Sequence, residues 1–293
     1  MKASSLNHKQ LSKRIPRRPL DSHKGMFGTV TVIGGQTGMV GAPLLAARAA
    51  LQLGAGCVHA VLLADDAPSV DLLHPELMLH KVTELLHFGF DEKEGSGENH
   101  WHADVLAVGC GMGRSQIAYI LLHNALQSPA ALVLDADALN ILAERPDLHV
   151  LLAARQATTV LTPHPGEAAR LLGCTSKEIQ QNRLAKAAAL RSRYHSSVVL
   201  KGANSVCATR DGKLYLNQTG NPGMSSAGMG DVLTGIIAAF IAQGMTGDDA
   251  LLLAVHLHGA AGDELAKQNA TLGMSASEVT TWARWLFNRI ASE

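Results

Sequence analysis

The sequence predicts an α/β fold in which a mostly parallel central sheet is covered by helices on both faces. Short runs rich in valine, isoleucine and leucine recur along the first two thirds of the chain. Their apolar residues follow one another without polar alternation, as in strands that are buried on both faces. Alanine- and leucine-rich stretches of helical length separate most of these runs. Beyond the last run, the chain is expected to be helical to its end.

The predicted strands all precede this helical end. They occupy residues 29–34, 57–63, 104–109, 131–137, 158–163 and 197–202. Helices are predicted between them, with the clearest ones at residues 42–55 and 178–194. A hairpin is expected within residues 205–217, because Asp211 and Gly212 form a turn that joins antiparallel strands. The final predicted helices cover residues 231–244, 248–268 and 275–290.

The composition excludes several functional classes. Lysine plus arginine and aspartate plus glutamate both number 25 among 293 residues. No net charge therefore favours nucleic acid, a membrane surface or another polyanion. No uncharged apolar stretch reaches the roughly 20 residues that a membrane span requires. We expect a protein that binds neither nucleic acid nor membrane, with 47% hydrophobic residues to build a sizeable core.

The cysteines and histidines do not form a metal-binding pattern. The four cysteines are scattered without a CxxC pair, and we expect reduced thiols in a cytoplasmic protein. They are Cys57, Cys110, Cys174 and Cys207. His256 and His258 are two residues apart, which places them on different faces of a helix. Most of the 14 histidines are therefore expected to be surface or core residues.

Two segments stand outside the predicted core. Residues 1–24 are expected to form a basic N-terminal arm, and residues 25–293 a single domain. The arm has three interpretations: a solvated segment, a segment that packs on a neighbouring subunit, or a transit peptide of similar composition. Residues 89–100 are polar and contain glycine, which predicts a mobile surface loop.

A glycine-rich segment, GNPGMSSAGMGDVLTG at residues 220–235, predicts an anion-binding site. It contains five glycines and two serines, and its second half begins an apolar helix. Glycines leave backbone N–H groups uncovered, and the N–H groups at a helix start attract anions. We therefore expect the segment to hold a phosphate at the carboxyl edge of the sheet, where ligands bind in this fold class.

Asp231 is the only charged residue in this segment and has two interpretations. An acidic residue in the first helical turn favours the helix dipole. A carboxylate beside a bound phosphate, in contrast, opposes the anion, yet it can accept a proton from an attacking hydroxyl. We favour the second interpretation, in which Asp231 is a general base.

Five motifs resemble those of the NAD(P)H-hydrate dehydratases, metabolite-repair enzymes of the ribokinase-like superfamily that require ADP or ATP. The motifs are HKGMFGTVTVIGGQTGMVGAPLLAARAALQLGAG, LVLDADALN, TPHPGEAARLL, VVLKGANSV and NPGMSSAGMGDVLTG. They follow the family's order along most of the chain. The resemblance implies a ribokinase-like fold and an ADP-dependent (S)-NAD(P)H-hydrate dehydratase, a hydro-lyase that stands alone without a companion epimerase domain.

The resemblance also implies roles for individual residues. The positions that contact the hydrated dinucleotide in the family correspond here to Ala42, Gly111, Gly113, His164 and Asp231. Those that contact the adenine nucleotide correspond to Lys201, Gly202, Ala203, Asn204, Ser205, Gly228, Met229 and Gly230. Glu167 would organise Mg²⁺ through water, as in related kinases that have asparagine where this chain has His164. Cys110 departs from the family pattern, which usually has proline before Gly111.

Structural explanations for these residues stay open. Ala42 could serve close helix packing, and the glycines at 111 and 113 could form a turn after a strand. Lys201 could be an exposed strand-end lysine, and Glu167 an acid at a helix N-terminus. Three polar residues after a predicted strand could bind Mg²⁺ through water or cap the next helix, and we treat them as pocket lining. They are Asp135, Asp137 and Asn140.

The resemblance implies hydrated NADH and NADPH as substrates, ADP or ATP as co-substrate, Mg²⁺ as cofactor, and a homo-oligomer such as a tetramer. Two other functions share the same pattern of residues. One is a kinase of this fold that phosphorylates a vitamin-precursor alcohol of the hydroxymethylpyrimidine or hydroxyethylthiazole type. The other is a non-catalytic nucleotide sensor. A stable phosphorylated alcohol would indicate the kinase, and nucleotide binding without turnover would indicate the sensor.

Overall fold

The computed structural model describes residues 2–6, 11–16, 18–83, 103–269 and 271–291. Within these residues, ten strands form one sheet in the order β1-β10-β9-β8-β7-β6-β5-β2-β3-β4. Only β9 runs antiparallel to its neighbours β8 and β10 in this part of the chain. The strands are β1 (Ser4–Ser5), β2 (Thr29–Gly34), β3 (Cys57–Leu62), β4 (Met78–Lys81), β5 (Val105–Val108), β6 (Ala131–Leu134), β7 (Thr159–Leu161), β8 (Ser197–Leu200), β9 (Val206–Ala208) and β10 (Leu214–Leu216).

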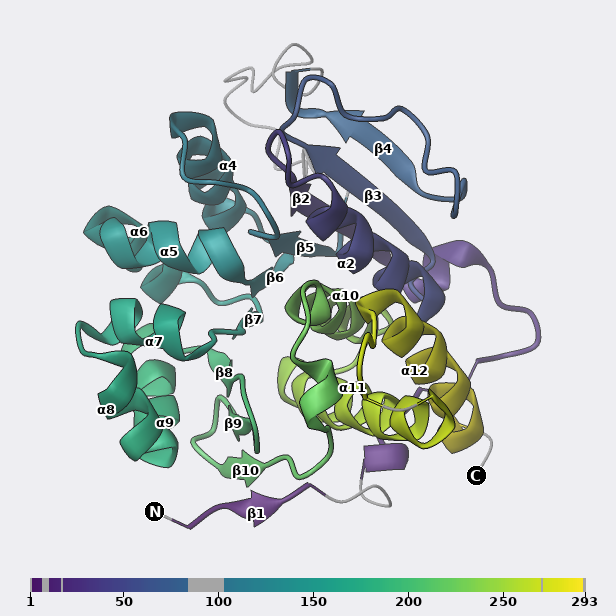
Figure 1. Cartoon of the computed structure of the whole chain (residues 1–293). Helices are drawn as coiled ribbons and strands as arrows, with labels where there is room; N and C mark the ends of the chain where they lie inside the picture. Colours follow the sequence, from purple (N-terminus) through teal and green to yellow (C-terminus); the bar gives the residue numbers. More distant parts are fainter. Residues whose placement is uncertain (1, 7–10, 17, 84–102, 270, 292–293) are drawn as a thin grey trace.

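Helices cover both faces of this sheet (Figure 1). One face carries α2 (Gly41–Gln52), α10 (Met229–Ala242), α11 (Gly247–Asn269) and α12 (Ala276–Ala291). The other carries α4 (Gln116–Gln127), α5 (Ala136–Glu144), α6 (Pro146–Ala154), α7 (Pro165–Leu172), α8 (Ser176–Gln181) and α9 (Arg183–Tyr194). Two short 3₁₀ turns lie at η1 (Lys24–Phe27) and η2 (Pro222–Met224).

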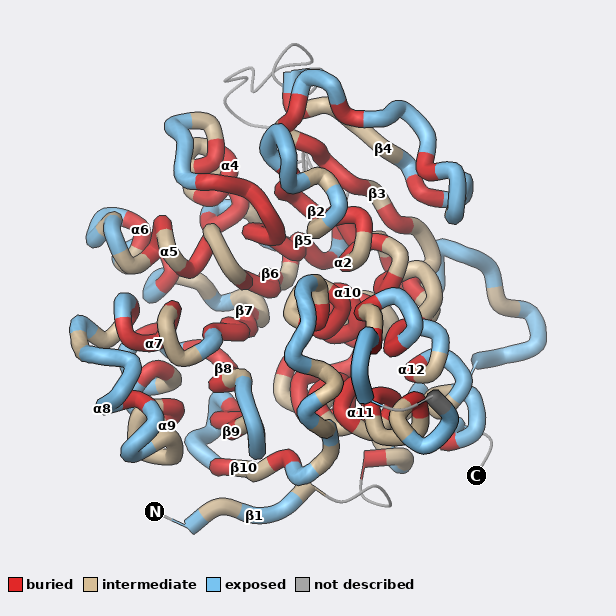
Figure 2. Tube along the Cα trace, in the orientation of Figure 1, coloured by how far each residue is buried: buried red, intermediate tan, exposed pale blue. Residues whose placement is uncertain are grey.

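The sheet separates two hydrophobic cores. In β2, Val30 and Val32 belong to the core under α2 and α10, whereas Ile33 belongs to the core under α4 and α5. Successive side chains of a strand point to opposite faces, so this strand must be apolar on both. Figure 2 shows the resulting buried band along the sheet. The predicted α/β class is confirmed.

Helices α2 and α10 approach each other closely at Gly235. A Cβ atom on Gly235 would lie 2.0 Å from the backbone oxygen of Ala46 in α2, so a larger residue would push the helices apart. The alanines of α2 serve the same close contact, and Ala46 and Ala47 are fully buried. This packing fixes the position of the first turn of α10, which carries Asp231.

The predicted strands and the hairpin are confirmed with small shifts at their ends. The prediction of one helix over residues 178–194 was wrong, because Asn182 adopts φ −145° and separates α8 from α9. Strands β1 and β4 were missed. Both are short edge strands, and β4 reads MLHK, which lacks a continuous apolar run. The loop predicted at residues 89–100 lies outside the described residues.

The described part of residues 1–24 packs on its own chain. Strand β1 pairs with β10, and Leu11 is buried in the core on the α2 side. Arg14 forms an ion pair with Asp249 in α11. The guanidinium of Arg18 lies over the Phe27 ring, 3.8 Å from its centroid. The described residues of this segment therefore contact the rest of the chain at these points, although Leu11 is the only one of them that is buried.

Two other expectations can be compared with the described residues. All four cysteines are free thiols, and Cys110 and Cys207 are buried, whereas Cys57 and Cys174 are partly exposed. None of the helices in the described ranges is long and apolar enough to cross a membrane.

Candidate active site

The first turn of α10 lies at the carboxyl edge of the parallel strands. Gly228 precedes the helix with φ +86°, a conformation that glycine adopts without strain, and no side chain of the described residues caps the helix start. The backbone N–H groups of Met229, Gly230 and Asp231 therefore have no partner within the helix. They leave the positive end of the helix dipole open to a ligand.

Asp231 faces two groups that follow neighbouring strands. The Cys110 sulfur after β5 and carboxylate oxygens of Asp135 after β6 and of Asp231 all lie within 4.8 Å of one another. Burial, and then the charge of Asp135, raise the pKa of Asp231 from 3.8 to about 6. Asp231 is thus ionised near neutral pH but close enough to titration to accept a proton.

The Asp135 carboxylate is held by an ion pair. Lys201 Nζ lies 2.6 Å from Asp135 Oδ1, and the Thr234 hydroxyl donates to Oδ2 at 3.0 Å. Lys201, at the end of β8, is therefore not the exposed lysine considered from the sequence, and the nearby carboxylates raise its pKa against the opposing effect of burial. Asp135 occupies the N-cap position of α5, yet its side chain makes no capping bond.

The grouping of Cys110, Asp135 and Asp231 does not suit a cation. Both oxygens of Asp135 already accept hydrogen bonds from protein donors. Burial raises the pKa of the Cys110 thiol well above its usual range, so the sulfur is a neutral thiol beside two carboxylates and not a preformed thiolate ligand. We interpret the group as a proton-handling cluster.

His164 and Glu167 close the start of α7 with a capping box. His164 Nδ1 accepts from the N–H of Gly166 at 2.9 Å, and Glu167 Oε2 accepts from the N–H of His164 at 2.7 Å. Burial raises the pKa of Glu167 to about 7. Glu167 is therefore an acid at a helix N-terminus, with its carboxyl group buried beside His164.

Three of the residues assigned to the substrate, Ala42, Gly111 and Gly113, lie in or next to the loops that follow β2 and β5. A Cβ on Gly111 would lie 3.1 Å from the Ala42 Cβ, and one on Gly113 would lie 2.0 Å from Gln36 Oε1. Both glycines have positive φ. Asp137 Oδ2 accepts from the N–H of Gly113 at 2.8 Å, which fixes the turn after β5.

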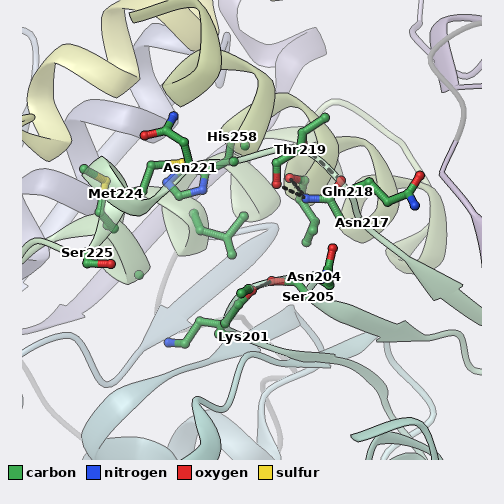
Figure 3. Close-up of a pocket in the computed structure, with 18 of the residues that line it drawn as sticks. Lys201, Asn204, Ser205, Asn217, Gln218, Thr219, Asn221, Met224, Ser225 and His258 are labelled. Atoms are coloured by element: carbon green, nitrogen blue, oxygen red, sulfur yellow. Dashed lines mark hydrogen bonds between the residues drawn. The ribbon is translucent and has the colours of Figure 1, made fainter. Parts of the chain in front are cut away.

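A cavity of about 740 Å³ opens beside the start of α10 (Figure 3). Most residues assigned to the nucleotide line it, namely Lys201, Gly202, Ala203, Asn204, Ser205, Met229 and Gly230, together with His164. Gly228 is not part of this lining. The cavity lies between the loop after β8 and the helices α10 and α11, and its volume is in the range of small-ligand sites.

The sequence missed several residues of this cavity. Asn217, Gln218 and Thr219 follow β10 and form its opposite wall. Asn217 Nδ2 donates to the backbone oxygens of Thr219 at 3.1 Å and Val255 at 3.3 Å, which anchors this wall to α11. One signal in the sequence could have identified this wall. Its polar residues lie directly after a predicted strand and before the glycine-rich segment.

His258 also lines the cavity, although its position in the sequence suggested a surface or core residue. Burial, and then the charge of Lys201, lower its pKa to about 4, so the ring is neutral near pH 7. Among the described residues, its Nε2 atom has no hydrogen-bond partner. A ligand or water in the cavity would satisfy this nitrogen.

Comparison with known proteins shows the family to which the sequence is similar. A family described as NAD(P)H-hydrate dehydratase matches residues 30–283. An ADP-dependent (S)-NAD(P)H-hydrate dehydratase of Neisseria meningitidis is 42% identical over 93% of this chain and 89% of the relative. A bifunctional NAD(P)H-hydrate repair enzyme of Moorella thermoacetica is 41% identical over 96% of this chain. The chain spans 53% of the length of that bifunctional relative.

The fold also resembles solved structures. The ADP/ATP-dependent NAD(P)H-hydrate dehydratase of Bacillus subtilis, co-crystallised with ATP and Mg²⁺, superposes with a TM-score of 0.86 and 27% identity over 99% of both chains. Further structural neighbours are ribokinase-like proteins. The predicted ribokinase-like architecture is confirmed.

Proposed function

The chain belongs to the NAD(P)H-hydrate dehydratase family, and from this premise we propose that it is an ADP-dependent (S)-NAD(P)H-hydrate dehydratase that repairs hydrated NADH and NADPH. The observation that carries the proposal is the pairing of an uncapped helix start with Asp231, beside a cavity of nucleotide size. The helix start would bind phosphate, and Asp231 would accept a proton directly beside it.

The reaction needs a phosphate site and a proton acceptor because hydroxide is a poor leaving group. The hydroxyl must first lose its proton and receive a phosphoryl group. The C6 hydroxyl oxygen of the hydrated ring attacks the terminal phosphorus of ADP, its proton passes to Asp231, and the bond to AMP breaks. The bond between C6 and oxygen then breaks, phosphate departs with the electron pair, and a ring proton is lost. The products are NAD(P)H, AMP and phosphate, or ADP in place of AMP when ATP is the donor.

Each part of the site has a role in this scheme. The N–H groups at the start of α10 would bind the moving phosphoryl group, where each charge-assisted hydrogen bond contributes about 1.5–3 kcal/mol. Lys201, held by Asp135, would neutralise phosphate charge, and the cavity would receive the nucleoside. Gly202 to Ser205 would contact the adenine nucleotide, and Gly228 would set the helix start.

The hydrated dinucleotide would bind on the Cys110 side of Asp231. Ala42, Gly111 and Gly113 present little side chain there, so a ring could approach the backbone closely. The half-exposed imidazole of His164 would form the remaining wall. In this arrangement the hydroxyl that accepts the phosphoryl group would lie between the two glycines, Gly111 and Gly113, and the start of α10.

Mg²⁺ fits this site as an ion held mainly by the nucleotide's phosphates and by water. Glu167 Oε2 and both carboxylate oxygens of Asp135 already accept hydrogen bonds, so these carboxylates suit contacts through water better than direct coordination. The ion would supply charge neutralisation for the phosphoryl donor.

A direct assay tests the function. Purified protein with hydrated NADH, Mg²⁺ and ADP should restore the absorbance of reduced nicotinamide and release one phosphate for each NADH formed. No recovery with either ADP or ATP would refute the proposal. Formation of a stable phosphorylated alcohol from a vitamin precursor would instead indicate the kinase.

We also propose a homo-oligomer in a reducing, cytoplasmic environment. Free cysteines fit such a compartment. Trp285 on α12 is 43% exposed and stands next to the partly buried Trp282, so this helix offers an aromatic surface to a second subunit. Light scattering measures the subunit number, and a monomer at all concentrations would contradict the oligomer.

A further inference from the structure

The side chain of His258 presents a buried nitrogen atom to the cavity beside α10. His258 lies in α11, is only 9% exposed, and belongs to the lining of this cavity. Within the described part of the chain, no group forms a hydrogen bond with its Nε2 atom. Buried polar groups in proteins are almost always paired, so this nitrogen indicates a partner that enters the cavity from outside.

The turn of α11 that carries His258 is fixed against the chain that follows β10. The Thr219 hydroxyl donates to the backbone oxygen of His256 at 3.0 Å. A Cβ atom on Gly259 would lie 2.3 Å from Thr219 Oγ1, so a larger residue would push the two segments apart. His258 is thus held at the cavity wall by contacts that do not involve a ligand.

The position of His258 along the cavity corresponds to the middle part of a nucleotide. In Figure 3, His258 lies between Met224 and Thr219, and across the cavity from Lys201. The phosphate end of the cavity is formed by Lys201 and the open start of α10. The sugar of a nucleotide directly follows its phosphates. A nucleotide with its phosphates at this end therefore brings its sugar to the middle of the cavity.

The chemistry of the His258 ring suits a hydroxyl group. Burial, and then the charge of Lys201, lower the pKa of His258 to about 4, so the ring is neutral near pH 7. A neutral imidazole has one N–H donor and one acceptor nitrogen. A hydroxyl both donates and accepts, so it can pair with Nε2 in either tautomer, whereas an ionised phosphate oxygen can only accept. The hydroxyls of ADP that remain protonated near pH 7 belong to its sugar.

We propose that His258 is a specificity-determining residue of the nucleotide site, whose Nε2 atom forms a hydrogen bond with a ribose hydroxyl of ADP and thereby favours ribonucleotides over deoxyribonucleotides. The inference rests on the proposed function, because that function makes ADP a ligand of the cavity. It deepens the proposed function by assigning the contact that holds the sugar between the phosphates and the base.

The test is a thermodynamic cycle between the His258 ring and the sugar hydroxyls. Calorimetry gives the Kd of the whole chain for ADP, 2′-deoxy-ADP and 3′-deoxy-ADP. One deoxy analogue should bind about 3–10-fold more weakly than ADP, the loss expected from one hydrogen bond. His258→Phe keeps an aromatic ring without nitrogen atoms. In this variant, that analogue and ADP should bind equally well to within about twofold, because the contact is already lost.

His256→Phe is the matched control. His256 lies two residues earlier in α11, outside the set of described residues that line the cavity. This variant should keep the wild-type preference for ADP. His258→Gln places an amide group near the position of Nε2 and should restore part of the preference, because an amide can donate or accept. Circular dichroism checks that each variant is folded, and the comparison of nucleotides in the wild-type chain requires no variant.

NMR of the ring nitrogens distinguishes the sugar from other partners of Nε2. Histidine is isotope-labelled, and the His258 signals are identified by their loss in His258→Phe. They should shift when ADP binds, while the ring stays neutral at pH 7. Protonation of the ring on binding would indicate a phosphate contact, and unchanged signals would mean that only water pairs with this nitrogen. Either result would overturn the inference.

The inference is also overturned if both deoxy analogues bind the wild-type chain as tightly as ADP, or if the preference for ADP persists unchanged in His258→Phe. Failure of the proposed function is a different result. A chain that binds ADP with this preference but never regenerates NADH would count against the dehydratase assignment, while the contact between His258 and the sugar would stand.

Discussion

Replacing Asp231 by asparagine should separate catalysis from nucleotide binding. Asparagine has nearly the same shape but cannot accept a proton from the substrate hydroxyl. Loss of a general base typically costs about 10²–10⁴-fold in rate. We therefore expect turnover of hydrated NADH to fall by that factor, while the Kd for ADP stays close to the wild-type value because the N–H groups of the helix start are retained.

The same substitution should stabilise the fold at neutral and alkaline pH. The pKa of Asp231 is raised from 3.8 to about 6, mainly by burial. A group with a raised pKa contributes its full stability below the unfolded value and loses it as the pH rises through the folded value. The shift of about two units corresponds to about 3 kcal/mol, which asparagine avoids. The difference in unfolding free energy should approach that value at pH 8 and vanish at about pH 3, below the unfolded pKa.

Three measurements test these two effects together. Absorbance of reduced nicotinamide gives the turnover, calorimetry gives the Kd for ADP, and urea unfolding at several pH values gives the stability. Asp21→Asn removes an exposed carboxylate and should change none of them. Undiminished turnover in Asp231→Asn would refute the base assignment and leave Asp231 as a residue that favours the helix dipole.

Other outcomes follow from the pKa values and the packing. The kcat/KM should fall about tenfold per unit below pH about 6, where Asp231 is protonated, and a flat profile would contradict the role of base. Lys201→Met leaves Asp135 buried without its partner, so unfolding free energy should drop by about 3–5 kcal/mol in urea titrations and ADP should bind more weakly. Gly235→Val places its Cβ 2.0 Å from a backbone oxygen of α2 and should prevent stable folding. Gly41→Ala has open space around the added carbon, and its melting temperature should stay close to wild type.

The sequence predicted the parts of the fold that depend on local patterns. Strand β2 is an example, because its residues must be apolar on both faces when helices cover both faces of the sheet. The glycine-rich segment likewise predicted an open helix start, since uncovered N–H groups follow from composition alone. In contrast, β4 depends on pairing with β3 at the sheet edge, and its four residues carry no pattern of their own.

The site was less predictable because its contacts join residues far apart in the chain. The ion pair between Lys201 and Asp135 spans 66 positions, and nothing in either motif alone reveals it. Cys110 was predicted to be a core thiol, which its burial confirms, but its position within 4.8 Å of the Asp231 carboxylate appears only in the folded chain. His258 is buried, which agrees with the prediction of a surface or core residue, but the spacing of two histidines on a helix does not indicate that one of them also lines a cavity.

The most direct measurement of the central claim follows one oxygen atom. Hydrated NADH carrying a heavy oxygen isotope in its C6 hydroxyl is converted with ADP, and the phosphate and water are analysed by mass spectrometry. If the phosphoryl group is transferred to that hydroxyl at the start of α10, the label leaves in inorganic phosphate. Label recovered in water, with ordinary oxygen in the phosphate, would mean that no phosphorylated intermediate forms and that the account is wrong.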